Sequence, residues 1–248
     1  MLNCVMPTWR QIFCKEDDNP DGFWNLDNCI YTSSSAVSMR MIFDSCIEQQ
    51  EKNITVLVPA YFCQETLNGA YTDRVRYLYY PICQDLNPDW KEVKALCAKE
   101  HIDVMVFCHY FGMYRDVDRT KNFCMQKKIV LIEDCAHVLY PGKRFGQKGD
   151  FVLYSPHKTL PLPDGGILWI NRSQDEWISC VQNAVRRSAQ SPIRKKAYKW
   201  RVKKSIQKVI GYQRKIEIDF KPHYGKKKVP DHSERSISVY SKRILFGY

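Results

Sequence analysis

The sequence predicts an α/β fold in which helices cover both faces of a mostly parallel sheet. Two observations support this prediction. From about residue 54 to residue 171, short apolar runs alternate with segments whose apolar residues recur at helical spacing. The runs are also nearly continuous in apolar residues, which is typical of strands that are buried on both faces of a parallel sheet.

The strand predictions follow from apolar runs that have the length of a strand. Residues 54–59 spell ITVLVP and residues 102–108 spell IDVMVFC, so both runs are suited to full burial. Shorter runs of the same kind predict the remaining strands. They lie at 76–80, 129–133, 151–154 and 167–171.

Helices are expected between these strands. One is predicted at 61–71, and another near 116–127. A third is expected to begin at Asn87-Pro88-Asp89. The apolar residues of this third helix recur at helical spacing, at Trp90, Val93, Leu96 and Cys97.

Three consecutive serines, Ser33 to Ser35, stand directly before another apolar-periodic segment. Serine caps helices well, and the free amides of a helix N-terminus can also bind a phosphate group. The pattern alone leaves both roles open.

Polar side chains stand where several predicted strands end. Ligands bind at the carboxyl ends of parallel strands, and His109, Asp134 and Ser155 all fall there. Asp134 ends a buried run, and Lys158 follows on a loop before a Pro-Asp-Gly-Gly turn. An anion for a pyridinium nitrogen and an amine for an aldehyde are what pyridoxal 5′-phosphate requires.

Composition excludes several classes of protein. With 44% hydrophobic residues, the 248-residue chain can bury a core and is not a disordered protein. No apolar run has the length of a membrane span, and the N-terminus shows no secretion signal. The eleven cysteines lack metal-ligand spacing, so we expect no metal site and a cytoplasmic protein with reduced thiols.

The net charge of +11 is concentrated in one part of the chain. Residues 172–248 hold 20 Lys and Arg against 6 Asp and Glu, whereas residues 1–171 are slightly acidic. We therefore predict a domain at 1–171 and a basic, mainly helical region at 172–248, with helices broken at Pro192 and Gly211 and a Pro/Gly/Lys segment at 221–231. The charge is compatible with a solvated helix face, a nucleotide-linked substrate, a membrane surface or nucleic acid.

Four segments in order resemble the DegT-like sugar aminotransferases, a branch of the fold-type I pyridoxal-phosphate enzymes. They are the serine-rich helix start at 33–36, VPAYFCQET at 58–66, His109-Tyr110-Phe111-Gly112, and IEDCAH (132–137) with SPHK (155–158). The similarity covers roughly residues 31–171. It implies a fold-type I large domain, followed here by a short, incomplete small domain.

The resemblance implies a role for each matching residue. Lys158 takes the position of the catalytic lysine that forms a Schiff base with the cofactor. Asp134 takes that of the partner of the pyridinium nitrogen. His137 stands where the family commonly has a glutamine near the 3′-oxygen. Some relatives have histidine in place of the lysine, but the glycine turn at 165–166 aligns Lys158, and not His157, with that position.

Further positions are implied to contact the cofactor. Ser34 and Ser35 match the family's phosphate-binding pair, and Ser155 adds a hydroxyl. An aromatic ring is expected to stack on the cofactor; strict alignment places Cys63 there, with Tyr61 and Phe62 just before it. His109 and Gly112 match the family's His-x-x-Gly segment.

As a family resemblance, this predicts a homodimeric enzyme that moves an amino group, from a donor such as glutamate, to a keto-sugar on a nucleotide. Such sugars serve polysaccharide or amino-sugar biosynthesis. A catalytically impaired relative with a structural or regulatory role is the alternative. Nucleic-acid binding through residues 186–228 is a third possibility, for which the sequence offers no recognised reader motif.

Overall fold

The computed structural model describes residues 2–3, 8–9, 29–138, 142, 144–171, 195–211, 215–216, 236–238, 241–242 and 245. The predicted helix break at Pro192 and the segment 221–231 lie outside these residues.

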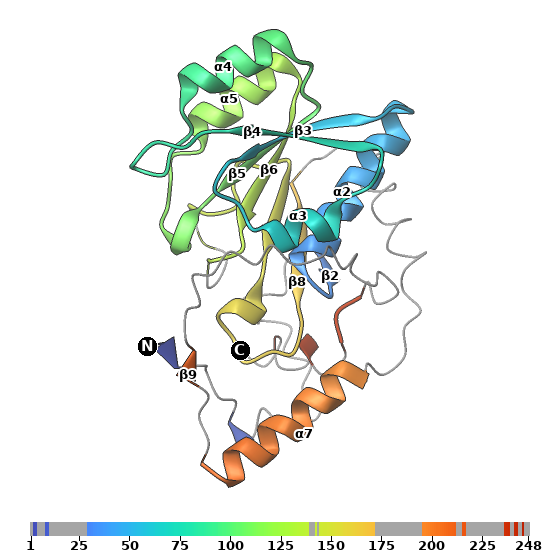
Figure 1. Ribbon diagram of the computed structural model, residues 1–248, viewed down its shortest axis with the longest axis vertical. Helices are drawn as coiled ribbons and strands as arrows, with labels where there is room; N and C mark the ends of the chain where they lie inside the picture. Colours follow the sequence, from blue (N-terminus) through green and yellow to red (C-terminus); the bar gives the residue numbers. More distant parts are fainter. Residues whose placement is uncertain are drawn as a thin grey trace.

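A seven-stranded sheet forms the centre of the molecule (Figure 1). Its strands lie in the order β2-β8-β7-β6-β5-β3-β4. Five strands run parallel, and β8 runs antiparallel to both of its neighbours. The prediction of a mostly parallel sheet is confirmed. The strand bounds are β2 (Cys29–Thr32), β3 (Ile54–Pro59), β4 (Val75–Tyr80), β5 (Val104–Cys108), β6 (Val130–Cys135), β7 (Phe151–Tyr154) and β8 (Gly166–Ile170).

Helices cover both faces of this sheet. On one face, α2 (Ser35–Gln50) and α3 (Gln64–Ala70) pack over strand residues such as Val56 and Ile132. On the other, α4 (Trp90–Lys99) and α5 (Asp118–Lys127) pack over residues such as Leu131. Leu131 and Ile132 are neighbours on β6, and successive side chains of a strand point to opposite faces of the sheet. This strand therefore contributes side chains to both halves of the core.

The helices begin where capping side chains satisfy their first amides. Ser34 Oγ accepts from Val37 N at 3.4 Å and caps α2. Asp89 Oδ1 accepts from Lys91 N at 3.0 Å and caps α4, so this helix starts at the predicted segment. Helix α3 starts at Gln64 rather than at residue 61, because the chain bends at residues 60–61 and Cys63 still has an extended backbone.

The C-terminal region contains one long helix, α7 (Lys195–Val209), and β9 (Lys215–Ile216), which pairs with β1 (Leu2–Asn3). Later residues return to the seven-stranded sheet. Ser236 bridges Thr32, and Leu245 is fully buried beside residues of β7 and β8. At these positions the C-terminal region shares the core, while the boundary near residue 172 stays a prediction.

Buried hydrogen bonds hold this return segment in place. The Asp164 carboxylate accepts from Ser238 N at 3.3 Å, from Ser238 Oγ at 2.7 Å and from Ser241 Oγ. Since Asp164 precedes the glycines that lead into β8, these bonds fix the loop between Lys158 and that strand. Among the described residues, no helix is long and apolar enough to cross a membrane, and the cysteines are free thiols.

Candidate active site

A cavity of about 200 Å³ opens at the carboxyl ends of β3, β5 and β6. This is the edge of a parallel sheet at which ligands bind. The lining mixes aromatic rings with a few polar groups, which suits a small organic ligand. The lining residues are Tyr61, Phe62, Cys63, Thr66, Cys108, Tyr110, Phe111, Asp134, Ala136, His137 and Lys158.

Asp134 supplies the buried negative charge of the cavity, with 8% of its surface exposed. The sequence predicts it just after a strand, but β6 continues to Cys135, so ladder pairing with Cys108 and Leu153 fixes the Asp134 backbone. Its Oδ1 accepts from Ala136 N at 2.9 Å, and Cys108 Sγ lies 3.7 Å from Oδ2. A thiol is a weak donor, so the carboxylate keeps capacity for a stronger one.

Lys158 lies across from this strand, in the 3₁₀ turn Pro156–Lys158 that follows β7. Its Nζ is 3.3 Å from Nε2 of His137. The preceding His157 has its Nδ1 2.6 Å from the Gly165 carbonyl oxygen, so that imidazole holds the glycine turn. Of His157 and Lys158, it is therefore Lys158 that lines the cavity.

His137 has partners at both ring nitrogens. Burial and the positive charge of a protonated Lys158 lower the pKa of His137, so the ring is neutral near pH 7. Its Nδ1 accepts from Phe111 N at 3.3 Å, which places the ring proton on Nε2. That proton points to Lys158 Nζ, and the contact is a hydrogen bond when the amine is uncharged.

A turn of unusual backbone conformation brings aromatic rings to the cavity. Phe111 adopts a left-handed φ of 57°, which is uncommon for a bulky residue. Its ring stacks on His137 with an interplanar angle of 4°. Gly112 allows this approach, because a Cβ there would lie 2.6 Å from the His137 carbonyl oxygen. Nearby, Tyr110 stacks on Tyr61.

The predicted phosphate-binding serines gather at the N-terminus of α2. Ser155 Oγ donates to Ser35 Oγ at 2.8 Å, which joins the end of β7 to the start of the helix. Both side chains are buried. Strand β8 passes very close, because a Cβ on Gly166 would lie 2.4 Å from the Ser34 carbonyl carbon. Three segments thus meet there, and Ser155 directly precedes the turn Pro156–Lys158, which brings Lys158 to the cavity.

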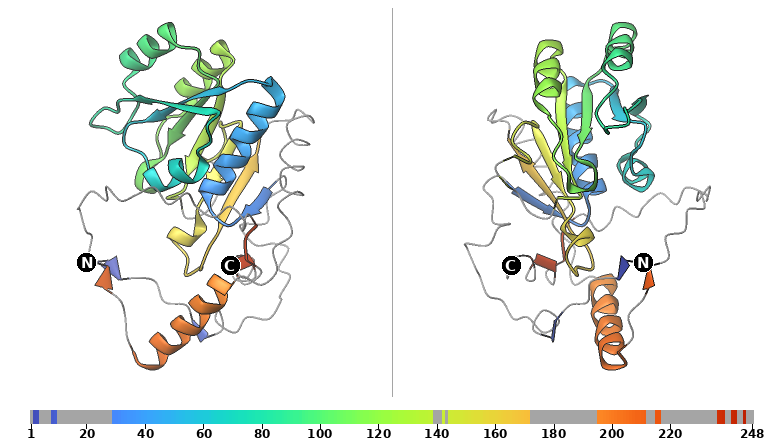
Figure 2. Two further views of the ribbon diagram at one scale, coloured as in Figure 1. Left: turned by 45° about the vertical axis from the view of Figure 1, so that its right-hand side comes forward. Right: turned by 90° about the vertical axis from the view of Figure 1, so that its left-hand side faces the viewer.

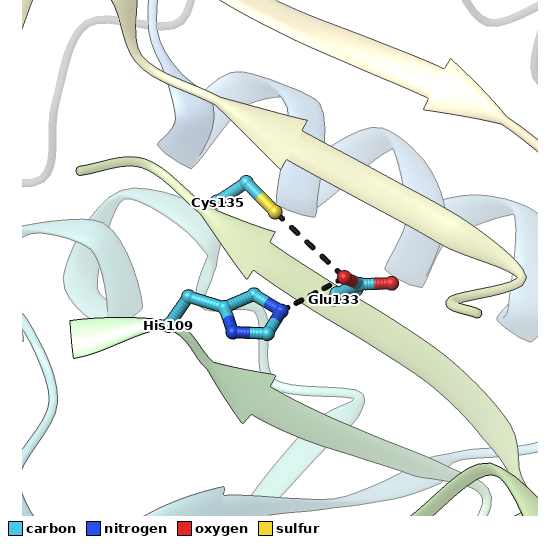
Figure 3. A group of neighbouring side chains, drawn as sticks. All are labelled: His109, Glu133 and Cys135. Atoms are coloured by element: carbon cyan, nitrogen blue, oxygen red, sulfur yellow. Dashed lines mark hydrogen bonds and ion pairs between the residues drawn. The ribbon is translucent and has the colours of Figure 1, made fainter. Parts of the chain in front are cut away.

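His109 lies in a second buried cluster, together with Glu133 and Cys135 (Figure 3). Its Nε2 donates to Glu133 Oε1 at 2.8 Å, and its ring packs edge-on against Phe107 from the α4–α5 face of the core. His109 is not among the residues that line the cavity. Its placement gives no support to the predicted contact with a cofactor.

The donor pattern of this cluster fits a loop anchor better than a metal site. Glu133 Oε1 accepts from Gly146 N at 2.7 Å, and Oε2 accepts from Lys148 N at 3.0 Å and Gly149 N at 2.8 Å. Burial alone raises the pKa of Glu133, but the His109 and amide hydrogen bonds outweigh it and lower the pKa. Because His109 Nδ1 accepts from Arg115 N, neither ring nitrogen has a lone pair left for a cation.

The structure thus gathers most of the predicted site residues and adds several. Asp134, His137, Lys158, Tyr61 and Phe62 line one cavity, and Ser34, Ser35 and Ser155 lie together at the start of α2. Cys108, Tyr110, Phe111 and Thr66 were not predicted. Of these, only Cys108 ends a strand, so the rule that strand-end residues face the ligand could have identified it.

Comparison with known proteins places this cavity in context. The model of the DegT/DnrJ/EryC1/StrS aminotransferase family matches residues 22–218. No curated protein sequence matches the chain.

Solved structures share the fold. NtdA from Bacillus subtilis, crystallised with its cofactor PMP, is 18% identical with a TM-score of 0.54, over 63% of this chain and 36% of NtdA. The aminotransferase TlmJ from Streptoalloteichus hindustanus is 16% identical with a TM-score of 0.56, over 89% and 52%. PseC from Helicobacter pylori, an aminotransferase of pseudoaminic acid biosynthesis, is 14% identical with a TM-score of 0.54, over 76% and 55%.

At these identities the similarity shows the fold alone, and it confirms the fold-type I prediction. The chain spans about a third to just over half of the length of these structures.

Proposed function

Because the chain belongs to the DegT/DnrJ/EryC1/StrS aminotransferase family, we propose that it is a pyridoxal-phosphate-dependent sugar aminotransferase. One observation carries this proposal: the Asp134 carboxylate on β6 and the Lys158 amine in the turn after β7 line the same small cavity. When bound, the cofactor supplies an aldehyde and an electron-withdrawing ring. The chain has to supply one group that bonds to the aldehyde and others that hold the ring.

The cavity fits the ring end of the cofactor. A buried carboxylate is costly unless a strong donor or a cation meets it. Asp134 has one amide and one weak thiol donor, so a protonated ring nitrogen satisfies its remaining demand. The rings of Tyr61 and Phe62 lie at the same cavity and offer apolar surface for the faces of a heterocycle.

Lys158 is the group that bonds to the aldehyde carbon and later holds a proton at Nζ. An amine attacks a carbonyl only when it is uncharged. The Nε2 proton of His137, 3.3 Å from Nζ, is complementary to that uncharged amine. His137 is thus a positioning residue, which orients the Nζ lone pair and is itself fixed by Phe111.

The phosphate end is assigned to the N-terminus of α2. This helix has 16 residues, and no acidic side chain stands in its first turn, so its partial positive charge is free to act on an anion. The Ser35 hydroxyl accepts from Ser155 Oγ and keeps its own proton to donate to an anion. Ser155 belongs to the segment that leads to Lys158, so one rigid piece holds both ends of the cofactor.

The finer features remain proposals from the family. They are a nucleotide-linked keto-sugar as acceptor, glutamate as the amine donor, a role in polysaccharide or amino-sugar biosynthesis, a homodimer, and a cytoplasmic location. The free thiols of the described cysteines agree with a reducing compartment.

The absorption spectrum tests the proposal. Purified protein titrated with pyridoxal phosphate is expected to develop a visible band that disappears when an amine donor is added. A Lys158→Ala variant is expected to lack the band, while Lys94→Ala, an exposed lysine of α4, keeps it. Asp134→Asn is expected to keep the band but bind the cofactor more weakly. An unchanged band in Lys158→Ala would exclude the assignment of the lysine.

A second candidate is a relative that binds the cofactor without turnover. Cys63, at the cavity, stands where the resemblance implies a stacking ring, which favours this candidate. A stable coloured protein whose band survives every amine donor tested supports it. Turnover with glutamate and a keto-sugar excludes it.

A further inference from the structure

Helix α7 (Lys195–Val209) is basic along its whole length. Its sequence, KKAYKWRVKKSIQKV, holds seven Lys and Arg residues and no Asp or Glu. It lies apart from the seven-stranded sheet in both views of Figure 2. The site proposed above uses none of its residues.

The described side chains of α7 have an inverted distribution. Tyr198, Val202, Ile206 and Val209 recur at helical spacing, and between 41% and 74% of each is exposed. The opposite side holds the buried Lys204 and the half-buried Trp200, and Gln207 is buried beside the stripe. A surface helix of a water-soluble protein normally turns its apolar stripe inward and its charges outward. Here the apolar stripe faces outward.

Cations border this stripe directly. Tyr198, Val202 and Ile206 line one shallow groove together with Lys199 and Lys203, and both lysines are exposed. An apolar strip flanked by lysines matches the boundary between acyl chains and anionic headgroups. Lysine stems also bury their methylene groups while the ammonium reaches the headgroup layer.

We propose that α7 binds the surface of an anionic membrane, lying in the plane of the interface. The stripe formed by Tyr198, Val202, Ile206 and Val209 enters the acyl boundary, and Lys199 and Lys203 contact lipid phosphates. This attaches the protein to a membrane through one helix that lies on the surface. The attachment is independent of the cofactor site.

Two other occupants fit less well. Nucleic acid would neutralise the lysines but leave the apolar stripe in water, so the most unusual feature of α7 would have no use. A second copy of α7 would cover the stripe but bring two sets of seven cations together. An anionic bilayer satisfies the stripe and the charges at once.

Vesicle flotation with the full chain tests the proposal. The protein is expected to float with vesicles of phosphatidylcholine and phosphatidylglycerol, to stay unbound with phosphatidylcholine alone, and to dissociate as salt rises. Val202→Gln/Ile206→Gln is expected to weaken binding by about tenfold or more. Lys199→Gln/Lys203→Gln is expected to weaken it by roughly 25-fold, since each lysine contributes about fivefold.

Matched controls come from other helices. Met125→Gln removes an exposed apolar residue of α5, and Lys91→Gln/Lys94→Gln removes two exposed lysines of α4. Both are expected to leave flotation unchanged, and circular dichroism checks that every variant folds. No binding to anionic vesicles overturns the proposal, as does equal loss in the controls. A dimer that Val202→Gln/Ile206→Gln dissociates, or tight binding to duplex DNA or RNA in place of vesicles, overturns it as well.

Discussion

Replacing Glu133 by glutamine tests how the sheet holds its functional edge. The carboxylate accepts from His109 and Gly146 on one oxygen, and from Lys148 and Gly149 on the other. A glutamine amide keeps only one oxygen, so its NH₂ group must face two of these buried donors. Each buried donor without an acceptor costs about 1–3 kcal/mol. After partial relaxation, we expect Glu133→Gln to lower the free energy of unfolding by about 3 kcal/mol.

Urea denaturation at several pH values measures this effect. The folded pKa of Glu133 lies below its ordinary 4.5, so its contribution is fully present above about pH 4.5 and is lost as pH falls through the folded pKa. The difference between wild type and Glu133→Gln is therefore expected to shrink in acid. Glu92→Gln, at an exposed position of α4, is the control and is expected to change stability by less than about 0.5 kcal/mol. A neutral-pH difference below about 1 kcal/mol, or one that grows in acid, would refute the anchoring role.

Two further substitutions test the packing around the site. Gly166→Ala places a Cβ 2.4 Å from the Ser34 carbonyl carbon, so we expect about 2 kcal/mol of destabilisation and weaker cofactor retention, measured by thermal melting and dialysis. Gly142→Ala meets nothing within 4 Å and is expected to behave like wild type; equal effects at both positions would contradict the close approach. Leu245→Ala empties a fully buried site beside β7 and β8, and is expected to lower the free energy of unfolding by about 3 kcal/mol. A loss below about 1 kcal/mol would show that the C-terminal segment does not share the core.

The parallel part of the sheet could be predicted because each of its strands is an apolar run of strand length. The runs at 54–59 and 151–154 match β3 and β7 at both ends. An apolar run does not indicate the direction in which its strand runs. The last strand was expected at 167–171, but nothing in its apolar run says that β8 is antiparallel. Its direction follows from the turn at Asp164, which C-terminal serines hold from more than 70 residues away.

Strand β2 could not be expected either. Cys29–Thr32 has only four residues, and it becomes a strand because β8 pairs with it across the sheet. Local propensity gives no account of such a distant partner.

Site residues could be predicted where a reactive side chain stands in an uncommon sequence pattern. A carboxylate after a buried run and a lysine before a glycine turn are unusual enough to identify Asp134 and Lys158. The rings of Tyr110 and Phe111 were not identified, because their position depends on the left-handed φ of Phe111 and the contact at Gly112. Sequence also leaves open which way a strand-end side chain points. His109 stands at the right end of β5, yet its ring joins Glu133.

The central claim is that Lys158 bonds to a cofactor whose ring nitrogen faces Asp134. Reduction of the cofactor-loaded protein with borohydride, followed by peptide mass spectrometry, tests it most directly. The account predicts one pyridoxyl group per chain, on the peptide that contains Lys158. Label spread over the lysines of α7, or confined to a lysine outside the cavity, would contradict it.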